Sequence, residues 1–243
     1  GSHGLGDVYK RQTGNCLYQE RILLYMNYDS VPLRDFKELN DWETVIFVYQ
    51  SALKQVETKI DILNGEFQHR HKYNPIEHVK SRIKTPESIV KKLKRHGYES
   101  SIENMVRYVN DIAGIRISCS FTSDIYLIAD MISKQNDLTI LARRDYMKNP
   151  KKSGYRSYHM LVTTPVFLSD SIIDTKVEIQ IRTVAQDFWA TLEHKMHYKF
   201  EGDGPDYITK ELRECARYVA ELDTRMEELN NEIQKYGKLS DKK

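Results

Sequence analysis

The sequence predicts an α/β (α+β) protein in which strands and helices alternate between two long terminal helices. Residues 176–183 alternate polar and apolar side chains strictly, which is the period of a strand, and the next apolar residues recur at helical spacing. Over residues 42–63 and again over 212–233, apolar residues step by three and four positions, as on one face of a long helix. A chain of 243 residues can bury a full core, and its length favours one domain.

The composition is that of an ordinary globular protein, with 40% hydrophobic and 30% charged residues. No apolar run approaches the roughly 20 residues of a membrane-spanning helix, so we expect no membrane partner. The three cysteines, Cys16, Cys119 and Cys215, are far apart and lack the spacing of a metal site. We expect Cys119 and Cys215 to be buried, reduced thiols, which favours a cytoplasmic location.

The expected domain organisation is simple. Residues 1–19 show no convincing period, and their first three residues resemble the scar of a cleaved expression tag, so we interpret them as a tag and a disordered N-terminus. Residues 20–243 are predicted to form a single domain with helical extensions at 41–64 and 206–236. No internal repeat or low-complexity segment divides this domain.

The first half of the domain is predicted to be mainly helical. The long helix of residues 41–64 is expected to stop at Asn64-Gly65, because glycine ends helices readily. A second helix should begin after Thr85, whose hydroxyl can cap it, and a third, short helix after Ser101. The strand of residues 114–120 follows, with alternate side chains directed to the core.

The second half is predicted to alternate strands with helices. A helix begins at Ser123-Asp124, and strands are expected at 138–141 and 156–164. The strand of residues 176–183 should run almost directly into a helix whose buried face is Val184, Phe188, Trp189 and Leu192. The last helix has a narrow apolar seam, which would pack over the sheet or between subunits; it consists of Leu212, Cys215, Val219, Leu222, Met226, Leu229 and Ile233.

The polar face of the strand at 176–183 is the most informative feature of the chain. Glu178, Gln180 and Arg182 share this face, opposite the apolar side chains that belong in the core. An acid, an amide and a guanidinium in one row suit either a solvated sheet surface or the floor of a polar site. Because the strand leads straight into a helix, and such junctions often hold ligands, the second interpretation stays open.

Positive charge is concentrated in two segments. Residues 80–96 carry a net charge of +6 and residues 143–156 carry +5, which leaves −9 for the remainder of a chain whose net charge is +2. Two basic segments on an otherwise acidic protein predict a site for a polyanion. The alternative is that both segments are ordinary solvated surface.

The second basic segment includes a loop with an aromatic residue. Residues 148–159 combine lysines with Pro150, Gly154 and Tyr155, and the strand that follows should place Tyr155 and His159 on one side. An exposed tyrosine among lysines can stack on a base while the lysines meet phosphate. Alternatively, the tyrosine packs on a neighbouring element.

The polar residues together favour a nucleoside polyphosphate. Asp111 precedes the strand at 114–120 and Glu178 lies on another strand, so two carboxylates can face the clustered cations. Carboxylates hold Mg²⁺ and cations neutralise phosphate oxygens at such sites. The glycine-rich phosphate loops and the kinase motifs are absent from the sequence, so side chains must hold the phosphates.

Five motifs occur in order along the chain: Arg82-x-Lys84, Asp111-Ile-Ala-Gly-Ile-Arg116, Lys152-Ser-Gly-Tyr155-Arg-Ser-Tyr-His159, Glu178-Ile-Gln180-Ile-Arg182-Thr and Phe188-Trp-Ala-Thr-Leu-Glu193-His194. Each motif would be weak evidence alone, but together they resemble the synthetase domain of the RelA/SpoT-type alarmone synthetases. The resemblance runs from about residue 41 to 235. No histidine is followed by aspartate, as in the hydrolase domain of the bifunctional members, so we expect a small, synthetase-only member without a hydrolase domain or C-terminal regulatory domains.

The resemblance implies a GTP diphosphokinase, which transfers the β,γ-pyrophosphoryl group of ATP to the ribose 3′-hydroxyl of GDP or GTP and releases AMP. It implies that Asp111 and Glu178 coordinate Mg²⁺ and that Glu178 also takes the hydroxyl proton. The two roles compete, because a bound metal lowers the basicity of a carboxylate. Residues implied on the ATP side are Arg82 and Arg116 around adenine and Lys84 and Lys92 on the phosphates; those implied on the acceptor side are Tyr155, stacked on guanine, with Arg144, Lys152, His159, Gln180 and Glu193.

The resemblance also implies a mixed β-sheet flanked by helices, of nucleotidyltransferase-like fold, and assembly into a homotetramer. Regulation by a nucleotide stays open, and Asp187 lies where some relatives have asparagine, which puts nearby acceptor contacts in question. Two other functions remain as alternatives: a non-catalytic module that binds RNA or nucleotides, and a nucleotidyltransferase that releases pyrophosphate. The products of a nucleotide assay distinguish these two alternatives from the GTP diphosphokinase.

Overall fold

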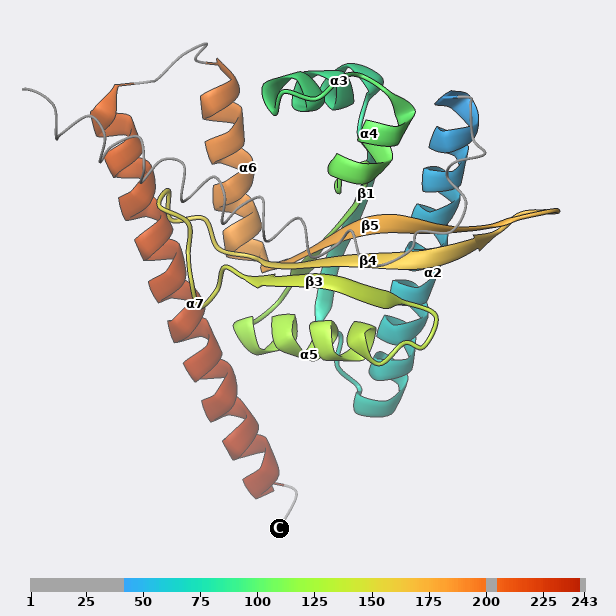
Figure 1. The fold of residues 1–243 in the computed structure, drawn as a ribbon. Helices are drawn as coiled ribbons and strands as arrows, with labels where there is room; N and C mark the ends of the chain where they lie inside the picture. Colours follow the sequence, from blue (N-terminus) through green and yellow to red (C-terminus); the bar gives the residue numbers. More distant parts are fainter. Residues whose placement is uncertain (1–41, 200–204, 241–243) are drawn as a thin grey trace, which may run out of the picture. The chain divides into compact units, whose positions relative to one another are not determined.

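The computed structural model describes residues 42–199 and 205–240, all within one compact unit that spans residues 35–243. The predictions for residues 1–19 and for Cys16 lie outside the described residues. No described helix is both long enough and apolar enough to cross a membrane. The elements (Figure 1) are α2 (Trp42–His71), β1 (Ile76–Ile83), α3 (Pro86–Arg95), α4 (Ile102–Tyr108), β2 (Ala113–Cys119), α5 (Thr122–Ser133), β3 (Thr139–Asp145), β4 (Tyr158–Phe167), β5 (Ile172–Thr183), α6 (Val184–Lys199) and α7 (Asp206–Ser240).

The centre of the fold is a mixed five-stranded sheet with the strand order β1-β2-β5-β4-β3. β5 pairs in parallel with β2 and antiparallel with β4, and the other two pairings are antiparallel. The apolar residues of β5, Val177, Ile179 and Ile181, are completely buried, as the alternation predicted. The mixed α+β architecture is therefore confirmed.

Helix α2 supplies much of the core but ends later than predicted. Its buried residues, Tyr49, Val56 and Ile60 among them, pack against the sheet, and the helix continues through Gly65 to His71. Glycine inside a helix costs only about 1 kcal/mol. Aromatic contacts of Phe67 stabilise the extra turns, and Lys72, with φ of 55°, turns the chain instead.

The two short helices begin where the sequence predicted. The Thr85 hydroxyl accepts a hydrogen bond from the Ser88 backbone N–H at 3.3 Å, and Ser101 caps α4 in the same way. Because Pro86 fits the first turn, α3 starts directly after β1. This tight connection brings the lysines of α3 to the edge of the sheet.

Strands β3 and β4 differ from their predicted bounds. Arg143 and Arg144 were assigned to a loop but belong to β3, which extends to Asp145 because it pairs with β4. β4 begins at Tyr158, two residues later than expected. Part of the second basic segment is therefore held on the sheet.

The predicted buried face of α6 is partly wrong. Val184 and Phe188 are exposed, whereas Trp189 and Gln186 are buried. Thr183 and Gln186 cap the helix start reciprocally: each side-chain oxygen accepts from the other residue's backbone N–H, at 3.1 and 3.0 Å. This capping draws Gln186 inward and so rotates the helix relative to the prediction.

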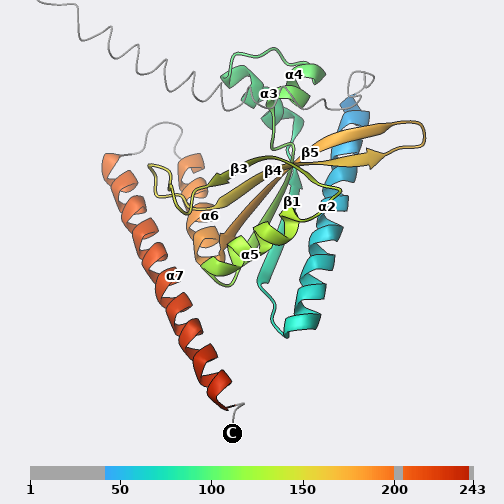
Figure 2. The same ribbon diagram turned by 60° about the horizontal axis from the view of Figure 1, so that its bottom comes forward.

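Helix α7 contacts the domain through a stripe made of two residues of the predicted seam, Leu212 and Val219, together with Ala216, which was not predicted. Ala216 is buried, and Leu212 and Val219 are packed beside it against Trp189 of α6, whose indole N–H donates to the Leu212 carbonyl. Cys215 lies next to this stripe and is exposed, so its predicted burial is wrong, whereas Cys119 is buried as expected. Figure 2 shows α7 beside α6 and extending beyond it. The rest of the predicted seam is exposed: Leu222, Met226, Leu229 and Ile233.

Candidate functional site

The register of the sheet aligns polar residues from all five strands on one face. Directly paired residues point to the same side of a sheet, so a chain of pairs defines a row across it. The row that crosses β1, β2, β5, β4 and β3 is Lys80, Arg116, Gln180, His159 and Arg144.

The neighbouring row on the same face contains a gap. Arg82 pairs with Gly114, and Gly114 pairs with Glu178. A Cβ placed on Gly114 would meet nothing within 4 Å, so the space beside Glu178 is open. The predicted residues Arg82, Arg116 and Glu178 therefore share one face, and the position of Gly114 between Arg82 and Glu178 is open.

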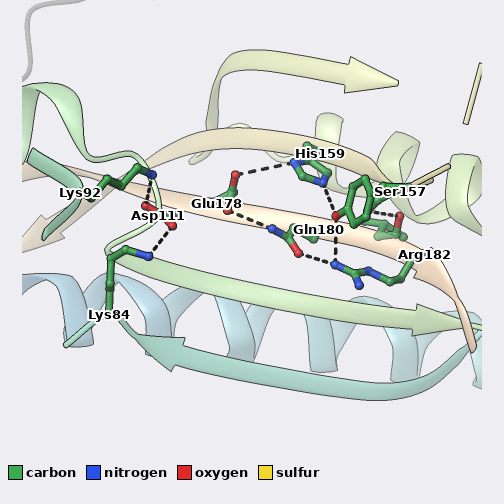
Figure 3. Close-up of polar contacts among 10 residues, drawn as sticks. Lys84, Lys92, Asp111, Ser157, His159, Glu178, Gln180 and Arg182 are labelled. Carbon is green, nitrogen blue, oxygen red and sulfur yellow. Dashed lines mark hydrogen bonds and ion pairs between the residues drawn. The ribbon is translucent and has the colours of Figure 1, made fainter. Parts of the chain in front are cut away.

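A charged group lies at the end of this face and is called here the Asp111 cluster, made of Asp111, Lys84 and Lys92. The two ammonium groups donate to different oxygens of the Asp111 carboxylate, at 2.8 Å from Lys84 and 2.7 Å from Lys92 (Figure 3). Burial alone would raise the pKa of Asp111, but the nearby charges and hydrogen bonds of the two lysines lower it to about 2. Asp111 is therefore an anion at all ordinary pH values.

A second group, called here the Glu178 ring, consists of Glu178, Gln180, Arg182, Tyr155 and His159. Arg182 donates to the Gln180 oxygen at 2.6 Å and to the Tyr155 hydroxyl at 3.1 Å. Gln180 donates to one Glu178 oxygen at 3.2 Å. The Tyr155 hydroxyl meets Nε2 of His159 at 2.8 Å, and Nδ1 of His159 lies 3.7 Å from the other Glu178 oxygen. The five side chains thus form a ring that meets both carboxylate oxygens of Glu178, in which the contact of His159 with Glu178 is longer than a hydrogen bond (Figure 3).

The electrostatic surroundings of Glu178 make it a stronger base than an exposed glutamate. Burial raises the pKa of Glu178, and the negative charge of Asp111 raises it further, against the lowering effect of Lys92 and Gln180. A carboxylate with a raised pKa binds a proton more readily. The site therefore contains one weakly basic acid, Asp111, and one more basic acid, Glu178.

His159 is held in its neutral form. Its ring is buried, and this burial, followed by the charges of Lys151, Arg182 and Arg144, lowers the pKa of His159 to about 3. A neutral imidazole has one donor and one acceptor nitrogen. His159 can therefore accept from one neighbour and donate to another at neutral pH.

Asp187 of α6 joins two arginines of the sheet. Its Oδ1 atom lies 3.5 Å from Arg182 and 3.7 Å from Arg116. At these lengths neither contact is a good hydrogen bond, and Oδ1 together with both arginine Nε atoms is buried without a hydrogen-bond partner. Three buried polar atoms, one each on β2, β5 and α6, thus lack a hydrogen-bond partner.

The loop that carries Tyr155 rests on α7. Gly154 has φ of 93°, and a Cβ added there would come within 2.5 Å of the Ala216 Cβ atom. Tyr155 is half-buried rather than exposed, with the Arg182 guanidinium 5.3 Å and the Lys151 ammonium 4.8 Å from its ring centre. Its hydroxyl end reaches the Glu178 ring, as the predicted common side of Tyr155 and His159 requires.

Not every predicted site residue is drawn into these two groups. Lys152 is exposed, and among the described residues nothing ties it to the Glu178 ring. Glu193 lies further along α6 and pairs with His197 at 3.1 Å. Arg144 shares the row of His159 without belonging to the ring, and Arg82 is exposed at the sheet's edge strand.

Two residues of the site had no assigned role in the sequence interpretation. Arg182 was left without a function and Asp187 was noted only as a departure from some relatives. The available signal for Arg182 was its place on the same face as Glu178 and Gln180, two residues further along the strand. Asp187 gave no such signal, because helical position relative to a sheet cannot be read from spacing alone.

Taken together, this sheet face carries two carboxylates of different basicity, ammonium and guanidinium groups and an open space between them. Such a donor set defines a protein that handles phosphate groups. Residues 81–203 match the family described as a region found in RelA and SpoT proteins. The chain belongs to this family, as the sequence motifs indicated.

Named relatives agree with this assignment. The chain is 45% identical over 195 residues to the GTP pyrophosphokinase YwaC of Bacillus subtilis (strain 168), an alignment that covers 80% of this chain and 93% of the relative. The crystal structure of small alarmone synthetase 2 from Bacillus subtilis is 44% identical, with a TM-score of 0.72 over 79% of this chain and 99% of that one. The structure of small alarmone synthetase 1 from Bacillus subtilis, bound to its product pppGpp, is 34% identical, with a TM-score of 0.74 over 79% and 98% of the two chains.

Proposed function

We propose that the protein is a GTP diphosphokinase that makes the alarmones ppGpp and pppGpp. It transfers the β,γ-pyrophosphoryl group of ATP to the 3′-hydroxyl of GDP or GTP and releases AMP. The observation that carries the proposal is that the Asp111 cluster and the Glu178 ring lie together on one face of the sheet, beside the open space at Gly114. The named relatives, which are GTP pyrophosphokinases and alarmone synthetases, support the same reaction.

Mg²⁺ is the proposed cofactor, held by Asp111 and Glu178 together with phosphate oxygens. Two carboxylates fit this role, because Mg²⁺ at nucleotide sites is held by one or two carboxylates and the substrate. Among the described residues there is no group of three or more His, Cys, Asp or Glu side chains that could hold a metal ion. When bound, the ion would neutralise charge on the transferred group.

On the ATP side, the two lysines of the Asp111 cluster are proposed to exchange partners. Without a nucleotide, Lys84 and Lys92 are both satisfied by Asp111. A polyphosphate offers each ammonium a new anion, and this exchange frees Asp111 for the metal. Arg82 and Arg116, which share a face on neighbouring strands, are proposed to hold adenine between their guanidinium planes.

On the acceptor side, Tyr155 is proposed to stack on guanine, which would replace the exposed Lys151 on its ring. Gln180 and His159 are placed to contact the nucleotide near Glu178. Arg144 continues their row and Lys152 extends from the loop, so both suit the acceptor's phosphates. Glu193 is proposed as an acceptor contact from α6, at the price of its pairing with His197.

Glu178 is the proposed base. It accepts the proton of the 3′-hydroxyl while the oxygen forms a bond to the β-phosphorus of ATP. The bond from that phosphorus to the α,β-bridging oxygen breaks, and AMP leaves with the electron pair. The raised pKa of Glu178 suits proton transfer, and the surrounding ammonium groups stabilise the negative charge of the phosphoryl oxygens.

Residues 20–243 are proposed to act as one cytoplasmic synthetase domain that assembles into a homotetramer. The exposed stripe of Leu222, Met226, Leu229 and Ile233 on α7 supports association between copies, because contiguous apolar surface is usually covered. Sedimentation of the purified chain would measure the number of copies.

A product-resolved assay tests the reaction. The protein is incubated with ATP and Mg²⁺ together with GMP, GDP or GTP in turn, and the products are separated. We expect AMP and a guanine nucleotide with a 3′-pyrophosphate, and the three acceptors also show which is preferred. Release of pyrophosphate would identify a nucleotidyltransferase, and binding without any product at micromolar protein would leave a nucleotide- or RNA-binding module.

A further inference from the structure

Arg182 determines which groups donate and which accept in the hydrogen bonds of the Glu178 ring. A guanidinium has five N–H donors and no acceptor, so both contacts of Arg182 within the ring are donations. A single nitrogen, Nη2, donates to Gln180 at 2.6 Å and to Tyr155 at 3.1 Å. Arg182 is 2% exposed, so these bonds face little competition from water. Two hydrogen-bond arms therefore start at one buried atom.

The first arm passes through Gln180. Because the Gln180 carbonyl oxygen accepts from Arg182, its amide nitrogen is turned toward Glu178 and donates to Oε2 at 3.2 Å. The orientation of this amide follows from the network, since the reverse orientation would set two donors against each other.

The second arm passes through Tyr155 and His159. The Tyr155 oxygen accepts from Arg182, and Ser157 is a further hydrogen-bond partner of the tyrosine; the second arm assigns the tyrosine O–H to Nε2 of His159, 2.8 Å away. A neutral imidazole that accepts at Nε2 carries its proton on Nδ1. That N–H faces Oε1 of Glu178 across 3.7 Å, so a small movement of either side chain completes the arm.

We propose that Arg182 is a positioning residue that orients the Glu178 carboxylate through Gln180 on one oxygen and through Tyr155 and His159 on the other. The inference rests on the proposed function, which makes Tyr155 the guanine platform and Glu178 the base. It adds that the same tyrosine that holds the acceptor base also helps to aim the carboxylate. Acceptor recognition and proton transfer are then coupled through one guanidinium.

The coupling makes Tyr155→Phe the informative variant. Phenylalanine keeps the aromatic ring for stacking and removes the hydroxyl that links Arg182 to His159. We expect the KM for GDP or GTP to change less than about threefold, while kcat falls about tenfold, as for loss of one positioned hydrogen bond. Arg182→Met cuts both arms and should lower kcat by about a hundredfold, whereas Arg182→Lys, which keeps a donor, should recover part of the loss.

Tyr146→Phe is the matched control. The Tyr146 ring also lies beside Tyr155 and His159, with ring centres 6.0 and 5.1 Å away, but its hydroxyl has no place in the ring of hydrogen bonds. The same chemical change at this position should leave kcat unchanged. Thermal unfolding of every variant shows whether lost activity reflects lost folded protein.

The tautomer of His159 supplies a test that does not need turnover. In the wild-type protein ¹⁵N NMR should show the proton of His159 on Nδ1, and Tyr155→Phe should release that preference. A proton on Nε2 in the wild type would overturn the direction of the second arm. If the wild type makes AMP but Tyr155→Phe and Arg182→Lys alter the acceptor KM alone, with normal kcat, Arg182 merely packs the loop and the inference fails. A wild type that forms no AMP refutes the proposed reaction. The His159 tautomer still tests the direction of the hydrogen bonds in the Glu178 ring.

Discussion

The two halves of the site are built from different kinds of interaction. The Asp111 cluster is a set of full charges, one carboxylate between two ammonium groups, drawn from the end of β1, from α3 and from the segment before β2. The Glu178 ring is a set of hydrogen bonds on β4, β5 and the loop before β4, in which the neutral side chains of Gln180, Tyr155 and His159 lie between one guanidinium and one carboxylate. The cluster can exchange partners for phosphates, because each ion pair has a polyanion as its natural substitute. The side chains of the ring hold one another in place, apart from the 3.7 Å contact of His159 with Glu178 and the Arg182 Nε atom, which has no hydrogen-bond partner.

This difference teaches how one sheet face can serve two nucleotides. The half that is proposed to meet ATP uses lysines, whose ammonium groups are point charges that can exchange one anion for another. The half that must present a hydroxyl to a base uses partly buried side chains that contact one another, four of them on β4 and β5 and Tyr155 on the loop before β4. The side chains whose positions are most closely fixed are therefore those around Glu178, where the proton is proposed to move.

Glu178→Gln should have the largest effect. The amide keeps the shape of the side chain but cannot accept the hydroxyl proton or balance a metal's charge. Turnover should fall by about 10³-fold or more, with nucleotide binding largely kept. AMP release under saturating ATP and GDP measures the change, and full activity in this variant would show that the base lies elsewhere.

Lys92→Met comes next and tests whether the Asp111 cluster exchanges partners. Loss of one charged contact to phosphate should raise the KM for ATP about 10- to 100-fold and alter the acceptor KM much less. Lys91→Met is the control, because Lys91 is an exposed neighbour on the same helix. Equal losses from both substitutions would mean that α3 acts through general positive charge alone.

His159→Gln should change how stability depends on pH. The pKa of His159 is about 3 in the folded protein and near its usual 6.5 when unfolded, so the unfolded chain binds the extra proton as the pH falls through 6.5. Between pH 7 and pH 5 this histidine should cost the wild type about 2 kcal/mol, and the variant should be spared that loss. Urea unfolding at both pH values provides the comparison.

The contribution of Asp111 to stability should not change over this range. Its pKa of about 2 lies below the unfolded value, so its stabilisation is present above about pH 4 and disappears only as the pH falls toward 2. Metal-free Asp111→Asn should therefore show the wild-type loss of stability between pH 7 and pH 5. An equal pH response of both variants would remove the distinction between the two halves.

Gly154→Ala should have the smallest effect and concerns the support of Tyr155. Alanine is strained at positive φ, by about 1–2 kcal/mol, and its Cβ would also collide with Ala216. Gly97→Ala is the control, since Gly97 has φ of 78° with nothing within 4 Å of an added Cβ. Gly154→Ala should lower the free energy of unfolding by about 1 kcal/mol more than Gly97→Ala does. A double-mutant cycle with Ala216→Gly should recover that difference, measured by thermal unfolding.

Much of the fold followed from local patterns. Alternation at residues 176–183 identified β5 and separated its buried residues from Glu178 and Gln180. Capping residues located the starts of α3 and α4. The motifs that resemble alarmone synthetases named nearly all residues of both halves, although Lys152 and Glu193 lie apart from them.

What could not be predicted depends on packing between elements. The length of α2 was underestimated because contacts of Phe67 outweigh a single glycine. The contact stripe of α7 centres on Ala216, a residue too small to stand out in an apolar seam. The role of Arg182 needs the register of β4 against β5, since its second arm crosses between strands.

The order of strands also bears on how the chain folds. β4 and β5 are joined by a short turn, in which the Leu168 N–H donates to the Ser171 carbonyl, so His159 and Gln180 meet by closing a small loop. Gly114 and Glu178 meet only when a much longer segment closes, at a higher entropic cost. During refolding, amides of the β4–β5 hairpin should gain protection before those of β2, which pulse-labelled hydrogen exchange would time. The acceptor half of the site would then exist as a folding unit before the donor half reaches it.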